Sequence, residues 1–152
     1  MKRLVLAAVA LTGLTAFAGA ASAAPTEAPG VEAKAVHTLR WKLAEIASHN
    51  VGGHDFAGAD RIRSARTGEI VGYDSFTGRY FPRTNSARID LAASVKGGIL
   101  VGRVRGEFSS NDAVFRGRVL KGTGRFQGAE GTMVVTLVGN EGRALVTIRY
   151  TA

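Results

Sequence analysis

From residue 37 to the end of the chain, apolar and polar residues alternate with a period of two in nearly every segment. This period places successive side chains on opposite faces of a β-strand, and no segment of eleven or more residues carries a helical stripe. The plainest case sets these residues on one face: Ala87, Ile89, Leu91, Ala93 and Val95. The region is therefore expected to be all β.

Turn signals divide this region into eight expected strands, covering 37–47, 56–65, 70–81, 86–96, 100–108, 113–120, 131–139 and 143–151. The turns are expected at 51–54, 66–69, 96–98, 109–112 and 140–142. Sequential strands joined by such short turns predict an antiparallel up-and-down β-barrel, whose interior is either packed or holds one small ligand. A lipocalin-like calyx is the nearest competitor, and a β-sandwich would need longer connections.

Four glycines interrupt the strand pattern at 122–132. A nucleotide-binding loop would need a helix next, but the segment that follows is rich in β-branched residues. We interpret the stretch as a plug in which Gly122 and Gly124 adopt backbone angles closed to other residues, while Phe126 and Ala129 tuck under the end of the sheet. The structural turn residues are Gly122, Gly124, Phe126, Gly128 and Gly131.

The plug sequence resembles the glycine-rich signature G-G-T-G-x-F/Y-x-x-A-x-G of the allene oxide cyclase and dirigent-like barrel family, which has secreted bacterial members. The resemblance covers about 37–152, where Gly-x-Asp-Phe at 53–56 and the Gly68 turn also fit. Two positions depart from the pattern: Lys121 replaces a usual glycine, and Glu130 stands where many relatives carry arginine. Any role of that arginine is therefore not carried over.

The resemblance implies a cofactor-free barrel whose cavity holds a reactive small molecule. Plant allene oxide cyclases close a cyclopentenone ring, dirigent proteins steer phenoxy-radical coupling, and related bacterial barrels include polyketide cyclases. Asp60 lies near the position of an acidic residue in the second strand of many relatives, and Trp41, Tyr80 and Phe115 are expected to shape the cavity. Plant relatives are often trimers, so a homotrimer or homodimer is an open expectation.

Three carboxylates are expected to share strand faces with apolar side chains. Asp60 accompanies Phe56 and Ile62, Asp74 accompanies Ile70 and Phe76, and Glu45 accompanies Trp41. Burial in a lumen would raise their pKa toward values useful for proton transfer. The alternatives are that Asp60 and Asp74 pair with arginines such as Arg61 or Arg79, or that the alternation slips by one at a bulge.

These patterns give a first set of candidate site residues. Asp60, Asp74 and Tyr80 are the catalytic candidates, and the ligand-binding candidates are Trp41, Glu45, Phe56, Phe76 and Phe115. The chain has no cysteine and no Gly-x-Ser-x-Gly nucleophile elbow. His37, His49 and His54 lack the spacing of a metal-ligand cluster, so no metal site is expected.

The N-terminus has the pattern of a signal peptide at 1–23. Lys2 and Arg3 precede an apolar run at 4–20, and Ala-Ser-Ala at 21–23 offers a cleavage site. We expect a mature, secreted protein that begins near Ala24 with a flexible leader at 24–36, followed by the barrel domain at 37–152. No membrane span is expected in the mature chain.

The mature chain is basic. The formal charge of +8 includes two N-terminal bases, so the mature chain carries 8 − 2 = +6. Such a charge favours anionic partners, although specific nucleic-acid binding would also need aromatic platforms among the bases, which are not evident. A non-catalytic extracellular module that binds anionic envelope polymers through a basic outer face is therefore the alternative function.

The leading hypothesis is a secreted barrel that binds a small apolar or phenolic molecule in its lumen. If the protein is an enzyme, it is expected to be a cofactor-independent isomerase or cyclase. A third hypothesis is a solidly packed barrel that serves only in assembly. A lumen of a few hundred cubic ångströms, lined by apolar groups with a few polar ones, would favour the first hypothesis.

Overall fold

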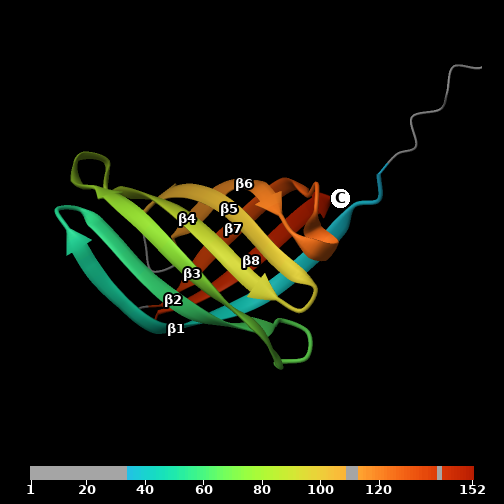
Figure 1. Cartoon of the computed structure of the whole chain (residues 1–152). Coiled ribbons are helices and arrows are strands. Elements are labelled where there is room, and N and C mark those ends of the chain that lie inside the picture. Colours follow the sequence, from blue (N-terminus) through green and yellow to red (C-terminus); the bar gives the residue numbers. More distant parts are fainter. Residues whose placement is uncertain (1–33, 109–112, 140–141) are drawn as a thin grey trace, which may run out of the picture. The chain divides into compact units, whose positions relative to one another are not determined.

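The strands of the protein close into an antiparallel barrel in sequence order, with β1 also pairing with β8 (Figure 1). The computed structural model describes residues 34–108, 113–139 and 142–152. The predicted signal peptide, most of the predicted leader, the loop at 109–112 and two residues of the hairpin at 140–142 lie outside the described residues. The up-and-down barrel expected from the sequence is confirmed.

The eight strands are β1 (His37–Gly52), β2 (Asp55–Ser64), β3 (Ile70–Phe81), β4 (Ser86–Val95), β5 (Gly98–Glu107), β6 (Val114–Gly122), β7 (Glu130–Val138) and β8 (Arg143–Thr151). Two short 3-10 helices, η1 (Pro82–Thr84) and η2 (Gly124–Phe126), lie between strands. Within the described part of the chain, no helix is long and apolar enough to cross a membrane.

The predicted plug closes one end of the barrel. η2 carries the Phe126 side chain into the interior, where it is fully buried and meets the Tyr150 ring edge-on at 5.7 Å. The backbone of the plug is fixed to β5 because the Thr123 and Arg125 N–H groups donate to the carbonyls of Ile99 and Gly97, each at 2.8 Å.

The two glycines at the start of the plug have different roles. Gly124 adopts a φ of +58°, as the sequence analysis expected. Gly122 does not have a positive φ, so that part of the prediction was wrong. A Cβ at Gly122 would instead lie 2.3 Å from the Phe126 carbonyl oxygen, so the residue allows a close approach of two backbone segments.

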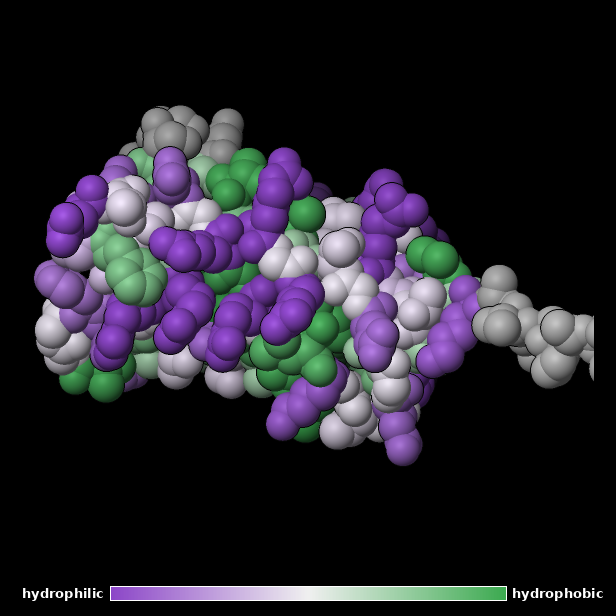
Figure 2. Space-filling view, turned by 90° about the horizontal axis from the view of Figure 1, so that it is seen from above, coloured by the Kyte–Doolittle hydropathy of each residue, from purple (hydrophilic) through white to green (hydrophobic). Residues whose placement is uncertain are grey.

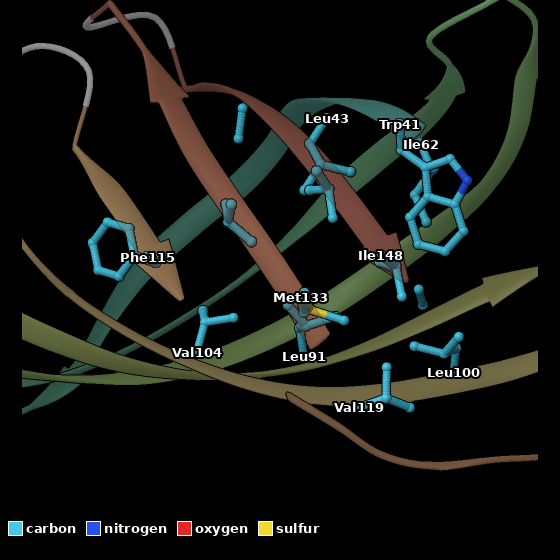
Figure 3. Packing of buried hydrophobic residues seen from close by; sticks show 14 of the residues in the cluster. Trp41, Leu43, Ile62, Leu91, Leu100, Val104, Phe115, Val119, Met133 and Ile148 are labelled. Atoms are coloured by element: carbon cyan, nitrogen blue, oxygen red, sulfur yellow. The ribbon is translucent and has the colours of Figure 1, made fainter. Parts of the chain in front are cut away.

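The buried core runs from the plug along the inside of the barrel. The largest fully buried side chains come from β2 and from β5 to β8 (Figure 3), together with one from η2: Ile62, Leu100, Val104, Phe115, Met133 and Ile148 on the strands, and Phe126 on η2. The faces predicted for β4 and β8 are confirmed, since Ala87, Leu91 and Ala93 are buried, as are Ala144, Val146, Ile148 and Tyr150.

Two local predictions were wrong because extra residues are inserted in the strands. β1 continues to Gly52 instead of ending at Ala47, and its register with β2 shifts at Ile46 and again at Val51. The register between β2 and β3 shifts at Val71, which separates Ile70 from the parity of Asp74. Ile70 is consequently 47% exposed and does not accompany Asp74.

Candidate active site in the barrel lumen

A cavity of about 440 Å³ occupies the barrel toward the end opposite the plug. Its residues come from the parts of β1, β2, β3, β4, β5, β7 and β8 that are remote from η2. The apolar lining comprises Leu43, Phe56, Phe76, Ile89, Leu91, Val104, Phe108, Val135, Leu137 and Ala144. The barrel is therefore packed in one part and hollow in another, which excludes the solidly packed interior.

Three carboxylates form a row across the wall of this cavity. Glu45 on β1 lies opposite Asp60 on β2, and Asp60 lies opposite Asp74 on β3. Directly opposed residues of antiparallel strands project to the same face. All three line the cavity, and we call them the acidic row.

The alignment of the acidic row depends on β-bulges in β3 and β1. Next to the β2–β3 turn, Arg63 pairs with Ile70, and this register would set Asp60 opposite Tyr73 and Asp74 on the other face of the sheet. The extra residue Val71 moves the register by one, so that Asp60 faces Asp74. The insertion of Ile46 ends the register that aligns Glu45 with Asp60. Such bulges re-aim side chains and are common beside active sites.

Asp60 and Asp74 are the buried members of the row. Their exposed fractions are 9% and 6%, whereas Glu45 is exposed. The Asp60 N–H donates to Asp74 Oδ1 at 3.2 Å. Among the described residues, neither side chain is in an ion pair with an arginine: Arg79 pairs with Asp55 on the outer surface, and the buried Arg61 Nε has no hydrogen-bond partner there. The predicted alternative of arginine pairing is therefore not observed.

Burial raises the pKa of both aspartates. Desolvation is the main cause for Asp74, and the charge of Asp60 adds to it, so that the pKa of Asp74 rises to about 7. The pKa of Asp60 rises to about 6, chiefly through desolvation and then through the charge of Glu45, while a hydrogen bond from Asp74 opposes the rise. The two carboxyl groups interact closely enough to titrate as a pair, and in the pH range between these values the pair holds one proton.

Aromatic side chains form the walls beside the aspartates. Phe56 lies opposite Gly78, Phe76 lies opposite Gly58, and the two rings meet edge-on at 6.3 Å. Each ring occupies the space above the opposing glycine, since a Cβ at Gly78 would lie 2.2 Å from Phe56 and one at Gly58 2.4 Å from Phe76. The absence of a side chain at these two glycines therefore leaves the space that the rings occupy.

The other sequence-predicted residues lie outside the cavity lining. Tyr80 packs against Phe108 at 5.9 Å, and its hydroxyl donates to Asn85 Oδ1 at 2.9 Å. Phe115 is fully buried and supports Phe108 from the side at 5.2 Å. Trp41 is buried toward the plug, where it borders a second hollow of about 910 Å³ that has no acidic residue in its described lining.

Several polar residues of the cavity were not predicted from the sequence: Ser48, His49, Asn50 and Arg143. The Ser48 hydroxyl donates to Glu45 Oε1 at 2.7 Å. The inserted Ile46 places Ser48 on the cavity side, so uninterrupted alternation could not find it. Phe108 could have been found, since it follows Val104 in parity. Among the described residues, no cluster of histidine, cysteine, aspartate or glutamate is suited to hold a metal ion.

Comparison with known proteins gives the fold. No protein-family model and no curated protein sequence matches the chain. The chain is similar to a solved structure of a pyocyanin demethylase, at 18% identity and a TM-score of 0.62, over 76% of this chain and 100% of that one. It is also similar to AbnU, an exo-specific intermolecular Diels-Alderase, at 12% identity and a TM-score of 0.60, over 79% of this chain and 98% of the other. At these identities the likeness establishes a shared barrel architecture.

Proposed function

We propose that this protein binds a small apolar or phenolic molecule in its lumen and transfers protons to and from it with Asp60 and Asp74. The observation that carries the proposal is the pair of buried, opposed carboxyl groups in a cavity of about 440 Å³. This volume lies within the range of small-molecule sites, which combine a mostly apolar lining with a few convergent polar groups.

The pair offers an acid and a base in one place. With a pKa of about 6 for Asp60 and about 7 for Asp74, the pair holds one proton between these pH values, so one carboxyl group can act as the acid and the other as the base. The protonated carboxyl group can then donate its proton to a substrate oxygen, and the ionised one can remove a proton from a neighbouring carbon, which restores the total number of protons on the pair. The net change is an isomerisation or ring closure that consumes no oxidant or reductant.

We propose a cyclase or isomerase of the allene oxide cyclase and dirigent-like type as the more specific assignment. Support comes from the plug sequence at 122–132 and from the barrel likeness to enzymes named as a demethylase and a Diels-Alderase. The apolar walls formed by Phe56, Phe76 and Phe108 suit a hydrophobic or aromatic substrate. This proposal gives Tyr80 a structural role, because its hydroxyl donates a hydrogen bond to Asn85 and its side chain does not line the cavity.

We further propose that the protein acts after export. The support is the sequence at 1–23, where basic residues, an apolar run and Ala-Ser-Ala occur in the order of a signal peptide.

The test begins with native mass spectrometry of the mature protein secreted by its own cells, to identify a co-purifying small molecule. Turnover and affinity for that molecule are then compared between the wild type, Asp74→Asn and Asp60→Asn. We expect turnover to fall at least about 100-fold in each variant, the usual lower range for loss of a general acid or base.

The matched control is Asp90→Asn, which removes an outward carboxylate that pairs with Arg103. This control should keep wild-type turnover. Unchanged turnover in both lumen variants would contradict acid–base catalysis. If adding the molecule left the NMR chemical shifts of Leu91 and Val104 unchanged, binding in the lumen would be contradicted.

A further inference from the structure

Five arginines gather on the outer surface of β4, β5 and β6. Arg88 lies opposite Arg105, Arg105 lies opposite Arg116, and Arg103 lies opposite Arg118. All five are exposed, and their strand neighbours on the inner face include the buried Val104 and Val119. We call these five residues the arginine face. Seen from above the view of Figure 1, where β5 and β6 run uppermost, hydrophilic side chains gather in a band over the molecule (Figure 2).

The acidic side chains among the described residues neutralise the arginine face only in part, and one of them is Asp55, whose pKa is lowered chiefly by Arg79 and also by the charge of Arg88. Arg103 forms an ion pair with Asp90, and Arg105 lies over the Phe81 ring at 5.5 Å. Within the described part of the chain, no acid forms an ion pair with Arg88, Arg105, Arg116 or Arg118. Glu107, also exposed on β5, lies opposite Ser86 and not opposite an arginine.

The arrangement is unfavourable for an isolated barrel. Directly opposed side chains of antiparallel strands have Cβ atoms about 4.5–5.5 Å apart, and like charges at this distance destabilise a sheet. Opposite charges in the same positions would stabilise it, as the Asp90–Arg103 pair does. The arginine face therefore lowers the stability of the barrel, and this cost is offset when a dense anionic partner covers it.

We propose that the arginine face binds a linear phosphate polymer. Guanidinium groups form paired hydrogen bonds with phosphate oxygens, and the arginines repeat about 5 Å apart across strands and about 7 Å apart along them. A phosphate polymer carries its negative charges close together along its own backbone, so its charge spacing matches the close spacing of the arginines. Phe81 lies against the arginine face, but Arg105 covers its ring, so the ring is not free to stack a nucleic-acid base.

Binding of inorganic polyphosphate to the full mature chain tests the proposal, measured by isothermal titration at several salt concentrations. We compare the wild type with the double variant Arg105→Gln/Arg116→Gln. The control double variant Arg40→Gln/Arg149→Gln removes the same charge from exposed positions on β1 and β8. We expect the first variant to bind polyphosphate at least about tenfold more weakly than the wild type. The slope of log affinity against log salt should also become shallower by about 1.4, because each of the two lost phosphate contacts contributes about 0.7 to that slope.

The control variant should bind within about twofold of the wild type. Equal weakening of both double variants would overturn the proposal, because binding would then depend only on net charge. Polyglutamate that bound as tightly as polyphosphate would overturn the assignment to phosphate, and tighter binding of oligothymidylate at equal charge would replace it with nucleic acid.

A stability measurement separates this role from a structural one. Without polymer, Arg105→Gln/Arg116→Gln should melt at the same temperature as the wild type or higher, because two opposed like charges are gone. A lower melting temperature would mean that these arginines serve to hold the sheet together, and would overturn the proposal. Asp90→Asn should strengthen polyphosphate binding about two- to fivefold, since it releases Arg103 from its ion pair.

Discussion

Replacement of Asp74 by asparagine should make the protein more stable at neutral pH while changing little at pH 4. Asparagine is nearly isosteric with aspartate, and the Asp60 N–H can still donate to the amide oxygen at position 74. The substitution therefore removes the titration of a carboxyl group that is only 6% exposed. The effect should appear as a pH-dependent difference in the free energy of unfolding.

The sign follows from the direction of the pKa change. The folded state raises the pKa of Asp74 from 3.8 to about 7, so between pH 4 and pH 7 the folded chain holds a proton that the unfolded chain has lost. Wild-type stability therefore falls as the pH rises through this window. At about 1.4 kcal/mol per pKa unit, the rise corresponds to at most about 4 kcal/mol.

The measurement is urea unfolding of the wild type and Asp74→Asn at five pH values from 4 to 8. The two proteins should have similar stability at pH 4, and the variant should gain by about 2–4 kcal/mol at pH 8. Asp60 still titrates in the variant, so some pH dependence remains. A carboxyl-carbon NMR titration of the wild type would give the Asp74 pKa directly.

Asp55→Asn serves as the control of opposite sign. A hydrogen bond from Arg79 lowers the pKa of Asp55, so its contribution to stability is present above its ordinary pKa and is lost as the pH falls. This variant should gain nothing as the pH rises. A constant stability difference between the wild type and Asp74→Asn from pH 4 to pH 8, together with an Asp74 pKa near 3.8, would refute the reasoning.

Other predictions concern the shape of the barrel and its chemistry. Gly124→Val should destabilise the barrel by about 1–3 kcal/mol, because its φ is +58° and a Cβ would lie 2.2 Å from the Gly97 carbonyl oxygen; an unchanged melting temperature would contradict this. Gly78→Ala should displace the Phe56 ring and alter ligand affinity at least about threefold with a loss of stability of about 1–3 kcal/mol, measured by titration and urea unfolding, whereas unchanged affinity would show that the ring does not shape the site. Turnover should follow a bell-shaped pH profile with limbs near pH 6 and pH 7, and a flat profile from pH 5 to pH 8 would contradict a role for the pair. N-terminal sequencing of secreted protein should begin near Ala24, and recovery of Met1 from a membrane fraction would contradict export.

The sequence was sufficient to predict the barrel and the side of the sheet on which Asp60 and Asp74 lie. Alternation is a local property, and it persists along most strands because one face is buried. The contact between the two aspartates was not predictable in this way. It depends on Val71, whose insertion changes the register of β2 and β3 by one residue. Nothing in the residue type of Val71 marks it as an insertion, since the bulge is fixed by how neighbouring strands pair around the closed barrel.

The position of Trp41 along the barrel axis was not predictable from alternation either. Trp41 has the parity expected of a lumen residue, but alternation does not say how far along the barrel axis a side chain lies. The structure places Trp41 near the plug, where it borders the second hollow and not the cavity that holds the acidic row. Sequence patterns therefore assign a residue to the inside of a barrel more readily than to one end of it.

Closure of one end by η2 has a consequence for how such a barrel can diversify. The plug contacts the buried core through Phe126 and Tyr150, so substitutions at these two residues should destabilise the folded protein. At the opposite end, Ser48, His49 and Asn50 lie on an exposed extension of β1 and contribute to the cavity without belonging to the buried core. Mutations at these positions can change which molecules enter and how they are oriented while folding is preserved. A library confined to these three positions is therefore the natural starting point for directed evolution of new substrate preferences on this scaffold.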